Sequence, residues 1–568
     1  MSGMPVGIDL GTTYSLISVF AEAGTSKLVP GADGTFLTPS AVGLSDTGSL
    51  LVGAAAKARQ LTNPDRTHVL FKRHMGTGKE FRLGRKTYSA SDLSALVLRK
   101  LADDFRAAYP DTAIESLVVS VPAYFSSAQR EATMLAAELA GLPRPRLVNE
   151  PTAAALAYGL QDREGESTFI VLDLGGGTFD VSIIEMFEGV MEVRASSGDV
   201  VLGGEDFTDV IARDISEKLL VDLDGVGDAK RSIIATAAEA VKRRLSEAAT
   251  AQVTVPLGKG KDYSLTREAF EALSAKLLIA LRRPIDRCLY DAGVSVDRID
   301  RVVLVGGATR MPMIRSLAAR ALRRLPEAGL HPDLVVAIGA SVQAALVQRN
   351  AALSDLTMTD VAPFSLGINS VVHMPSGTIQ NGFTPIIERS TILPASRSQR
   401  FSTIADQQAE IEFGVFQGES PMAFENARIG EGKVRVPRAP AGQEGIDVRF
   451  SYDTSGLLHV GITVVSTGQR SEIVIEGGAQ SLSPEERKRR IRALEALMVH
   501  PRDESVNVAT LERLKGLYSM LLGQERESSA ELIARFEQAL ASQDPRRIAQ
   551  VRDEVELAAS RMEENYVR

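Results

Sequence analysis

The stretch that decides the fold runs from Phe169 to Ile184 and reads FIVLDLGGGTFDVSII. Two apolar runs of strand length flank Asp173, three consecutive glycines and Thr178, and this pattern predicts a β-hairpin. A hairpin turn needs only one or two glycines, so the third exposes further backbone N–H groups. Such groups can surround an anion, while an acid at the end of a strand can hold a cation directly or through water. The stretch predicts a site for phosphate and metal, although an ordinary glycine-rich hairpin would explain it if it stood alone.

The N-terminus repeats this layout. Residues 6–20 read VGIDLGTTYSLISVF, in which Asp9, Gly11 and two threonines separate two apolar runs. Two copies separated by alternating strand and helix patterns predict two similar lobes, whose hairpins face each other across a cleft and hold a polyphosphate from both sides. A third glycine loop, at 306–307 in VLVGGATRMP, opens a helix whose first N–H groups can support a nucleotide. The ordered set of three loops favours a phosphate-binding site over chance hairpins.

The bulk composition is that of a globular protein with more than one core. The chain has 568 residues, of which 44% are hydrophobic and 24% are charged, and this length predicts two or more domains. The net charge of -8 argues against a nucleic-acid partner, and the six histidines form no ligand-spaced cluster, so any metal should be bound by oxygen. We expect no membrane partner and a cytoplasmic location, because the sequence shows neither a span of about eighteen apolar residues nor an export signal. The only cysteine, Cys288, excludes an internal disulfide and should be a buried core thiol.

The pattern changes twice along the chain. Strand and helix patterns alternate up to about residue 350, short strands separated by turns fill residues 361–477, and helical periodicity returns after residue 482. The sequence SPEE at 483–486 is a helix-start signal, and Asp544 with Pro545 repeats it. The last predicted helix carries three apolar residues on one side: Ile548, Val551 and Val555. We therefore expect an α/β part, an all-β part and a helical part.

A series of motifs resembles a known family. In order along the chain they are GIDLGTTYS, VPAYF, NEPTAAALAYG, DLGGGTFDVSI, LGGEDF, LVGGATRMP and VQAAL. In this order and wording they resemble the seventy-kilodalton heat-shock chaperones of the DnaK type, over residues 6–347 and further through APFSLGI, STILPASRSQRFST and VFQGE. The resemblance implies an ATP-dependent chaperone that binds extended apolar segments of unfolded proteins, with peptide affinity controlled by MgATP binding and hydrolysis. The short helical end resembles the HscC branch of this family.

The resemblance implies a multidomain architecture that agrees with the three parts. Residues 1–353 would form an actin-like α/β ATPase domain of two lobes, 354–361 the interdomain linker, 362–480 a β-sandwich substrate-binding domain and 481–568 a short α-helical lid. In the linker, DLTMTDV, Thr357 and Thr359 stand where the family's leucine-rich linker has two leucines. Burial of the linker against the ATPase domain should therefore be weaker, with Met358 as its main anchor.

The resemblance also implies which residues are catalytic. They are Asp9, Lys72, Glu150, Asp173 and Thr178. A fixed Lys72 ammonium beside the γ-phosphate would stabilise negative charge in a largely dissociative transition state. Glu150 would orient the attacking water or accept its proton, and the following proline should hold it in extended backbone. The implied ligands are ATP or ADP, Mg²⁺ held by Asp9 and Asp173 through water, and K⁺ as a further candidate.

A larger set of residues matches the family's nucleotide-binding positions. These are Gly11, Thr12, Thr13, Tyr14, Gly175, Gly176, Gly177, Asp180, Gly203, Gly204, Glu205, Glu239, Lys242, Arg243, Ser246, Gly306, Gly307, Arg310 and Asp333. The four residues from Glu239 to Ser246 lie at i, i+3, i+4 and i+7, on one side of a helix. Without the resemblance, a solvated charged face would be the simpler explanation of that spacing, as a surface charge would be of a lone lysine.

The resemblance further implies a peptide groove and partner surfaces. Candidate groove residues are Ile368, Phe401, Ile404, Ile411 and Phe413, although alternation alone cannot separate a groove from the sandwich interior. Pro122 and Arg130 resemble interdomain switch positions, whereas Arg146, Asn149 and Thr152 resemble positions that face a J-domain co-chaperone. Unfolded polypeptides and a J-domain protein are the expected partners. The segments at the lobe edge are short, which puts dependence on a nucleotide exchange factor in doubt.

Two other classes of protein share parts of this pattern. An actin-like small-molecule kinase would have the phosphate hairpins but would need neither a strand-rich domain nor a helical cap. A regulatory or filament-forming relative would bind nucleotide without needing both Lys72 and Glu150. The chain has the lysine, the acid and the strand-rich part, which favours the chaperone.

Overall fold

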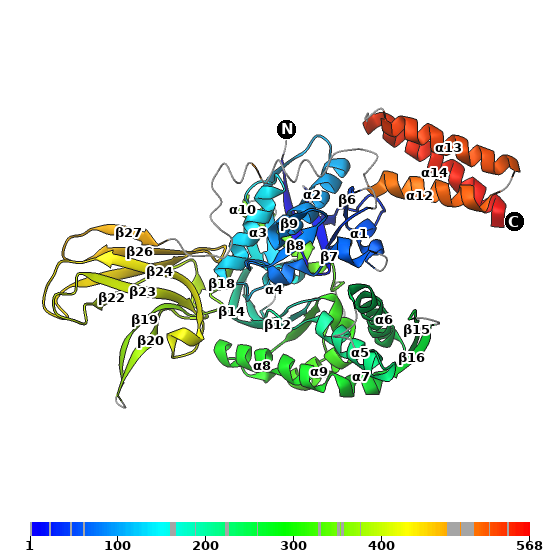
Figure 1. The fold of residues 1–568 in the computed structure, drawn as a ribbon. Coiled ribbons are helices and arrows are strands. Elements are labelled where there is room, and N and C mark those ends of the chain that lie inside the picture. Colours follow the sequence, from blue (N-terminus) through cyan, green and yellow to red (C-terminus); the bar gives the residue numbers. More distant parts are fainter. Residues whose placement is uncertain are drawn as a thin grey trace.

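The two predicted hairpins form the centres of two separate sheets. In the computed structural model, β1 (Gly3–Leu10) pairs antiparallel with β2 (Tyr14–Phe20), and β12 (Ser167–Leu174) pairs in the same way with β13 (Phe179–Phe187) (Figure 1). In both hairpins the acid is the residue before the last in the first strand. The structure describes residues 3–21, 24–45, 48–60, 63–159, 166–187, 189–221, 227–257, 260–327, 331–348, 353, 357–374, 377–473, 489, 505–521, 523–541 and 545–567.

Each hairpin belongs to one lobe. The first lobe also contains β3 (Ser26–Leu28), β4 (Thr38–Pro39), β5 (Ala41–Leu44), β6 (Leu50–Val52), α1 (Ala54–Arg59), η1 (Pro64–Arg66), β7 (Thr67–Val69), η2 (Phe71–His74), β8 (Glu80–Leu83), β9 (Lys86–Ser89), α2 (Ala90–Ala108), β10 (Ala113–Val121), α3 (Ser127–Leu139) and β11 (Arg146–Asn149). The second lobe also contains β14 (Val190–Asp199), α5 (Gly204–Lys218), α6 (Asp228–Glu247), β15 (Thr250–Val255), β16 (Lys261–Thr266), α7 (Arg267–Leu273), α8 (Ala275–Ala292), η3 (Val296–Arg298), β17 (Arg301–Val305), η4 (Gly307–Arg310) and α9 (Pro312–Leu322). Two helices, α4 (Glu150–Gly159) and α10 (Val335–Val347), pack on each other, α10 also against the first sheet and α4 also against the second.

The two sheets share one topology. The first has the order β11-β10-β1-β2-β3, with β4 beside β2, and the second begins β17-β12-β13-β14. In both, the first hairpin strand pairs in parallel with a later strand, β10 or β17, and the second hairpin strand pairs antiparallel with the strand that follows it. This repetition confirms the two similar lobes predicted from the sequence echo.

Short polar motifs determine where the helices of the first lobe begin. Ser89 and Asp92 form a capping box at the start of α2, in which the Ser89 N–H donates to Asp92 Oδ2 at 2.8 Å. Ser126 and Gln129 do the same at α3, where the Ser126 N–H donates to Gln129 Oε1 at 2.9 Å. Both boxes satisfy N–H groups that have no acceptor inside the helix. They fix the beginnings of α2 and α3, and α3 carries Arg130.

The all-β part begins as a continuation of the second sheet. The strand β18 (Thr357–Val361) pairs in parallel with β14 and antiparallel with β21 (Ile392–Leu393). Residues 354–356 of the predicted linker lie outside the described residues. The part of the linker that is described therefore forms an additional strand of the second lobe, and a two-residue strand of the all-β part extends the sheet further.

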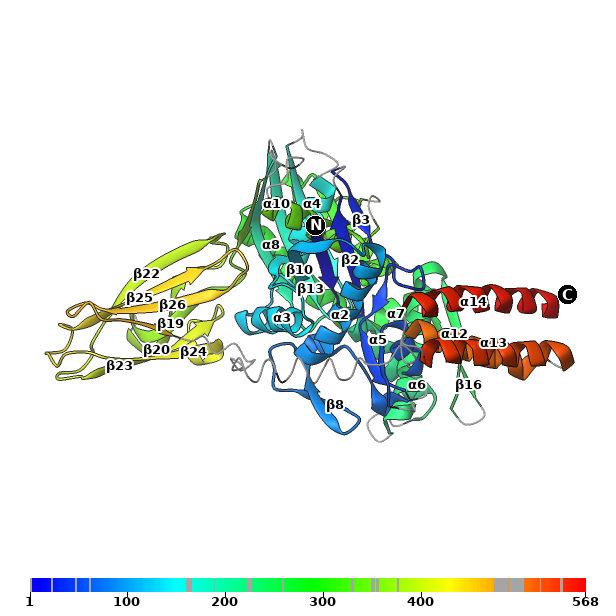
Figure 2. The same ribbon diagram turned by 90° about the horizontal axis from the view of Figure 1, so that it is seen from above.

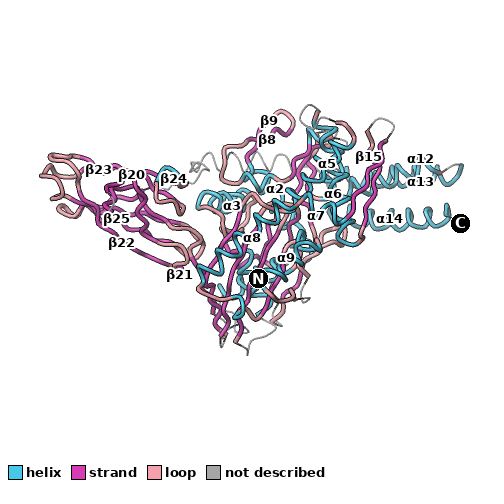
Figure 3. The backbone as a smooth tube through the Cα atoms, turned by 90° about the horizontal axis from the view of Figure 1, so that it is seen from below, coloured by secondary structure: helices cyan, strands magenta, loops and turns pink. Residues whose placement is uncertain are grey.

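Two four-stranded sheets form the body of the all-β part. Their orders are β20-β19-β23-β24 and β22-β25-β26-β27. Figure 3 shows β20, β22, β23, β24 and β25 gathered in this strand-rich part. The elements are β19 (Leu366–Met374), β20 (Gly377–Ile387), β22 (Ala395–Ser402), β23 (Glu410–Gln417), η6 (Ala423–Glu425), β24 (Ala427–Arg435), β25 (Gly445–Tyr452), β26 (Leu458–Val464) and β27 (Arg470–Ile473). Alternating residues of both sheets, among them Val415, Val448 and Phe450, bury one shared apolar core. This arrangement is the predicted β-sandwich.

Three helices form a separate bundle at the C-terminal end. They are α12 (Ser505–Met520), α13 (Gly523–Ala541) and α14 (Pro545–Val567), and they bury an apolar core of their own around Leu514, Phe536 and Val555. The helix-start signal at 483–486 lies outside the described residues, whereas Pro545 does begin α14. Figures 1 and 2 show the sandwich and this bundle on opposite sides of the two lobes. A lid role for the bundle stays a prediction.

Two smaller expectations can be compared with the structure directly. Cys288 is fully buried in the core of the second lobe, as predicted. Within the described ranges, none of the helices combines the length and the apolar character needed to cross a membrane.

Candidate functional site

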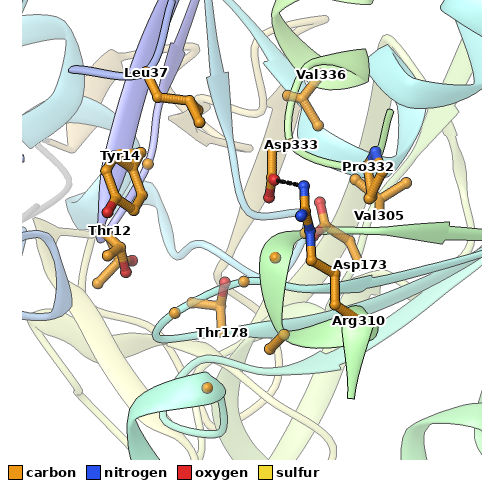
Figure 4. A pocket seen from close by; sticks show the side chains of 18 of the residues that line it. Thr12, Tyr14, Leu37, Asp173, Thr178, Val305, Arg310, Pro332, Asp333 and Val336 are labelled. Atoms are coloured by element: carbon orange, nitrogen blue, oxygen red, sulfur yellow. Dashed lines mark hydrogen bonds and ion pairs between the residues drawn. The ribbon is translucent and has the colours of Figure 1, made fainter. Parts of the chain in front are cut away.

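A cavity of about 570 Å³ lies between the two hairpins, where the lobes face each other. Figure 4 shows Thr12 and Tyr14 on one side of it and Val305, Arg310 and Asp333 on the other. Thr12 and Tyr14 belong to the β1–β2 hairpin. Val305 ends β17, Arg310 ends η4, and Asp333 lies two residues before α10. The volume is that of a pocket for a small organic molecule.

The hairpins touch each other beside this cavity. A Cβ atom on Gly176 would lie 2.0 Å from Thr13 Oγ1, so a residue with a side chain cannot occupy this position unless Thr13 shifts. Thr13 Oγ1 is itself buried and has no hydrogen-bond partner among the described residues. A buried hydroxyl without a partner is costly unless a bound molecule supplies one. The contact therefore leaves a polar atom at the cavity wall for which the described residues supply no partner.

Three carboxylates lie beside the hairpins: Asp9, which is half-buried, and Asp173, which is buried, line the cavity, and the buried Asp180 lies close to Asp173. Burial, followed by the charge of Glu150, raises the pKa of Asp9 to about 7 and that of Asp180 to about 8. Burial and the neighbouring acids Glu150 and Asp180 raise the pKa of Asp173 well above its usual value. Ser120 Oγ donates to Asp9 Oδ1 at 2.7 Å, and the Tyr124 N–H donates to Asp180 Oδ1 at 3.1 Å. So much buried negative potential favours the binding of a cation.

Lys72 and Glu150 form a buried ion pair inside the cavity. Lys72 Nζ lies 2.7 Å from Glu150 Oε1, and both residues line the cavity wall. The lysine comes from η2, and its ammonium lies 5.5 Å from the centre of the Phe125 ring. Glu150 is the first residue of α4, so the predicted extended backbone was wrong: Pro151 lies in the first helical turn, where a missing N–H costs no hydrogen bond. The arrangement holds an ammonium and a carboxylate at one point beside the two hairpins.

The opposite end of the cavity is formed by one side of α6. Glu239, Lys242, Arg243 and Ser246 all line it, as their spacing predicts. Glu239 Oε2 lies 2.7 Å from Lys242 Nζ, and Glu239 Oε1 accepts from Arg243 Nε at 2.8 Å. Burial alone would raise the pKa of Glu239, but Lys242 and these hydrogen bonds lower it. The helix therefore presents fixed, oriented charges rather than a solvated surface.

A second cluster of polar side chains, between β17 and α10, also lines the cavity. Arg310 forms an ion pair with Asp333, and Arg310 Nη2 lies 2.9 Å from His331 Nε2. Arg243 Nη2 donates to the Tyr14 hydroxyl at 3.2 Å and thereby connects α6 to the first hairpin. The guanidinium groups of Arg243 and Arg310 both line the cavity, and such planar groups can stack on a flat aromatic ring.

The whole chain was compared with models of protein families. A model described as Hsp70 protein matches residues 5–81 and 77–566. The chain belongs to the Hsp70 family. Members of this family are ATP-dependent chaperones that bind ATP or ADP with Mg²⁺ and act on unfolded clients together with co-chaperones.

Two features of the Hsp70 cleft fit a nucleotide and a magnesium ion, and a third bears on how the metal would be held. One lining residue, Thr13, has a buried hydroxyl oxygen that lacks a partner in the part of the chain that the structure describes, and Asp180, which does not itself line the cavity, has another such atom, Oδ2. In and beside the cleft lie acids whose raised pKa values would fall beside a cation, because an opposite charge favours the carboxylate. No group of three or more His, Cys, Asp or Glu side chains among the described residues is arranged around a metal position. Mg²⁺ would therefore complete its coordination with water and phosphate oxygens, as it usually does.

Most of the predicted site residues lie together in this Hsp70 cleft. Those that line the cavity are Asp9, Gly11, Thr12, Thr13, Tyr14, Lys72, Glu150, Asp173, Gly175, Gly176, Thr178, Gly204, Glu205, Glu239, Lys242, Arg243, Ser246, Gly306, Gly307, Arg310 and Asp333. Gly177, Asp180 and Gly203 are not among the lining residues. A Cβ on Gly203 would lie 2.6 Å from the Gly177 nitrogen, so these two glycines pack on each other behind the hairpin.

Several lining residues were not predicted. They are Leu16, Leu37, Glu247, Val305, Ala308, Met311, His331, Pro332 and Val336. His331 and Pro332 directly precede Asp333, so their position in the sequence could have indicated them. Leu37 comes from the segment before β4, and nothing in its local sequence distinguishes it from an ordinary loop residue.

The predicted switch residues lie where the first lobe meets the sandwich. Arg130 is buried and donates to Asn149 Oδ1 at 2.8 Å and to the carbonyl of Ser455, in the sandwich, at 3.3 Å. Pro122 lies at the end of β10, and its carbonyl accepts from the Phe125 N–H at 3.1 Å. The guanidinium of Arg130 therefore connects α3 to both β11 and the sandwich.

Two of the positions predicted to face a J-domain protein bind the linker strand here. Asn149 Nδ2 and Thr152 Oγ1 donate to Asp360 Oδ2 at 2.8 and 3.1 Å. Both side chains are buried by this contact, and only Arg146 is exposed. Burial raises the pKa of Asp360, while the hydrogen bonds act in the opposite direction. The J-domain role stays a prediction.

A second contact fixes the sandwich to the second lobe. Arg389 donates to both oxygens of Asp291 on α8, at 2.7 and 2.8 Å, and to Glu419 Oε2 at 2.6 Å. Nearby, the rings of Tyr124 and Phe364 lie with their centres 4.1 Å apart. We call these contacts, together with the Arg130 and Asp360 hydrogen bonds and the β18 pairing, the docking joint.

The predicted groove residues divide into two groups. Ile368, Ile411 and Phe413 are buried in the sandwich core, and Phe401 packs against the same core. Ile404 differs, because it lies between β22 and β23 with 71% of its surface exposed. The assignment of a peptide groove to these residues stays a prediction.

Proposed function

We propose that this Hsp70 chain hydrolyses ATP in its cleft and uses β18 to transmit the state of the cleft to a peptide-binding sandwich. The observation that carries the proposal is one continuous sheet: β18 pairs with β14, and β14 pairs with β13, which carries Asp180. A nucleotide that moves the second hairpin would move this sheet, and with it the strand from which the sandwich continues.

The cleft residues divide the work of phosphoryl transfer. The unpartnered Thr13 hydroxyl and the glycine backbone of both hairpins would hold the phosphates. Lys72 would stabilise negative charge on the transferring group, since its ammonium is already held in place by Glu150 at 2.7 Å. Once the lysine turns to the phosphate, the Glu150 carboxylate is released to orient the attacking water and accept its proton. Both groups therefore have a role before and during the reaction.

The metal and nucleoside positions follow from the same geometry. Asp9 and Asp173 would hold Mg²⁺ through water, and the ion supplies positive charge that neutralises the phosphates when bound. Glu239, Lys242 and Ser246 would bind the ribose side, and Arg310 the base. Residues of both lobes line the cavity, so a bound nucleotide contacts both lobes. Binding therefore favours the arrangement in which the lobes close around the nucleotide.

Communication with the sandwich would use the docking joint. The Tyr124 N–H donates to Asp180 of the second hairpin, while the Tyr124 ring lies against Phe364 at the beginning of the sandwich. A shift of the second hairpin would therefore move Tyr124, and with it the contact between the Tyr124 and Phe364 rings in the docking joint. In the arrangement described here the joint is closed, and we assign it to the state in which the sandwich releases peptide.

The peptide would be bound as an extended segment on the sandwich, with its backbone hydrogen-bonded and an apolar side chain in contact with Ile404. Ile404 is the candidate that can be tested without unfolding the domain, because it is exposed. Phe424 on η6 is a matched control, since it is also 71% exposed and belongs to the same domain.

The experiment is the release of a fluorescent, extended apolar peptide from the full chain in ADP and in ATP. We expect ATP to speed release at least ~10-fold, since a change of that size needs a differential binding energy of only ~1.4 kcal/mol. Ile404→Asp should weaken peptide binding at least ~10-fold, because a carboxylate would be desolvated against an apolar side chain. Phe424→Asp should leave binding and release unchanged. Release that is the same in both nucleotides, or a phosphorylated small-molecule product, would contradict the proposal.

A further inference from the structure

Two adjacent basic residues of η2 serve different parts of the molecule. Lys72 lines the cavity and contacts Glu150, whereas Arg73 is not among the residues that line it. Instead, Arg73 Nη2 lies 2.7 Å from Asp206 Oδ2. Asp206 lies in the first turn of α5, which belongs to the second lobe. The ion pair therefore crosses from one lobe to the other, directly beside the proposed catalytic lysine.

Asp206 also connects this ion pair to the second phosphate hairpin. The Gly203 N–H donates to Asp206 Oδ2 at 2.7 Å, so the acid caps the start of α5. The next two N–H groups, of Gly204 and Glu205, donate to the carbonyls of Gly175 and Gly176 at 2.8 and 2.9 Å. A displacement of Asp206 would therefore be transmitted through these three hydrogen bonds to Gly175 and Gly176 of the second hairpin.

Arg73 contacts the same hairpin from its outer side. A Cβ atom on Gly177 would lie 2.8 Å from Arg73 Nε and 3.0 Å from Thr12 Cγ2. The arginine side chain therefore covers the bare backbone of Gly177, next to a threonine of the first hairpin. Its Nε atom is buried there and has no acceptor among the residues that the structure describes. The guanidinium is held in place by Asp206 and by packing.

We propose that Arg73 and Asp206 are positioning residues that lock the two lobes around the phosphates and so set the rate at which nucleotide leaves. Separating the lobes requires breaking this ion pair, and Lys72 moves with Arg73 because the two are neighbours in one short helix. A second hydrogen bond between side chains of the two lobes beside the cavity, from Arg243 to Tyr14, is 3.2 Å long, and the Arg243 side chain is 59% exposed. The stronger connection is thus at the phosphate end. This inference rests on the proposed function, since it assumes that the cleft holds a nucleotide.

The test uses the full chain and a fluorescent ADP whose release is followed by stopped flow. The variants are Arg73→Met, Asp206→Asn and the two combined. Asparagine keeps an oxygen that can accept from the Gly203 N–H while removing the charge. Arg282→Met is the matched control, because Arg282 Nε lies 2.7 Å from Asp286 Oδ1 within α8, outside the cleft. Single-turnover hydrolysis and apo melting are measured in parallel.

Each single variant should speed ADP release by ~10-fold, the effect of losing about 1.4 kcal/mol from a charge-assisted contact. The double variant should be no faster than the singles, since both remove the same contact. Arg73→Lys should restore part of the slow release, and apo melting should stay unchanged, which a merely structural role would not give. Unchanged release in the variants, or effects of the two substitutions that multiply, overturns the proposal. A wild-type chain that binds no ADP overturns it together with the proposed function, whereas normal binding with unchanged release overturns it alone.

Discussion

The cleft and the docking joint are both places where two parts of the chain bring charged groups together, but they treat those groups differently. In and beside the cleft, Thr13 Oγ1 and Asp180 Oδ2 are buried without partners in the described residues, and acids crowd together with raised pKa values. In the joint, Arg389 has two acid partners, and Asp360 accepts from two side chains.

The difference indicates what each region is built to do. Buried polar atoms without partners cost free energy until a third molecule binds, so the cleft is suited to a ligand. The joint satisfies its own groups, so it can be stable without a ligand and can open when its parts move apart. One atom of the joint departs from this rule, because Thr359 Oγ1 is buried without a partner in the described part of the chain.

The largest expected effect concerns the cleft. Lys72→Ala should keep nucleotide binding but lower single-turnover hydrolysis by at least ~100-fold, because the charge that stabilises the transition state is lost. Single-turnover hydrolysis of radiolabelled ATP measures this. Lys100→Ala is the control, since Lys100 Nζ also lies 2.7 Å from a carboxylate, Asp104 Oδ2, but on α2. Near-normal hydrolysis in the Lys72 variant would mean that Lys72 only forms an ion pair with Glu150 and does not take part in the reaction.

A smaller effect is expected when the joint loses its best ion pair. Asp291→Asn should shift the joint toward the open state by about tenfold, because the Asp291 side chain is only 4% exposed and holds Arg389 at two points. Hydrogen exchange of the β18 amides would report the opening.

The control for this variant is an ion pair of similar shape outside the joint. Arg400 donates to both oxygens of Asp447, at 2.8 and 3.1 Å, on the exposed face of the sandwich. Asp447→Asn should leave β18 protection unchanged. If both variants open the joint equally, the Asp291 contact is no more important than a surface ion pair.

The smallest effect should come from the one unsatisfied atom of the joint. Thr359→Val keeps the shape of the side chain and removes the buried hydroxyl, so docking of β18 should strengthen by ~1 kcal/mol, or about fivefold. ATP-accelerated peptide release should rise accordingly. Thr359→Ser is the control, because it keeps the hydroxyl.

If β18 docks more weakly in the Thr359→Val variant, the Thr359 hydroxyl must find a partner in a state other than the one described. The weak docking expected from threonines in the linker would then be wrong. Met358, which packs against the core beneath β18, would remain the main apolar anchor of the linker.

Local patterns in the sequence predicted the cleft well because its chemistry is local. Each hairpin carries its acid, glycines and threonine within a few residues, and α6 presents its charges by helical spacing alone. Where prediction failed, another local rule acted: Glu150 was expected to be extended before a proline, but it begins α4 because a proline is compatible with the first helical turn. Leu37 reaches the cavity only because β4 pairs beside β2.

The sequence by itself determined the two lobes, the phosphate hairpins, the change to a strand-rich part and the membership of a family, because these depend on periodicity, turn chemistry and ordered motifs. Only the tertiary structure decided which charges meet. Arg389 and Asp291 are 98 residues apart, and Arg73 and Asp206 are 133 apart. No local pattern relates such residues, since their contact follows from how whole lobes and sheets pack. The tertiary structure likewise left Ile404 exposed while burying Ile411, although both are isoleucines of one predicted groove. Side-chain alternation states which residues share a face, but only packing decides what covers that face.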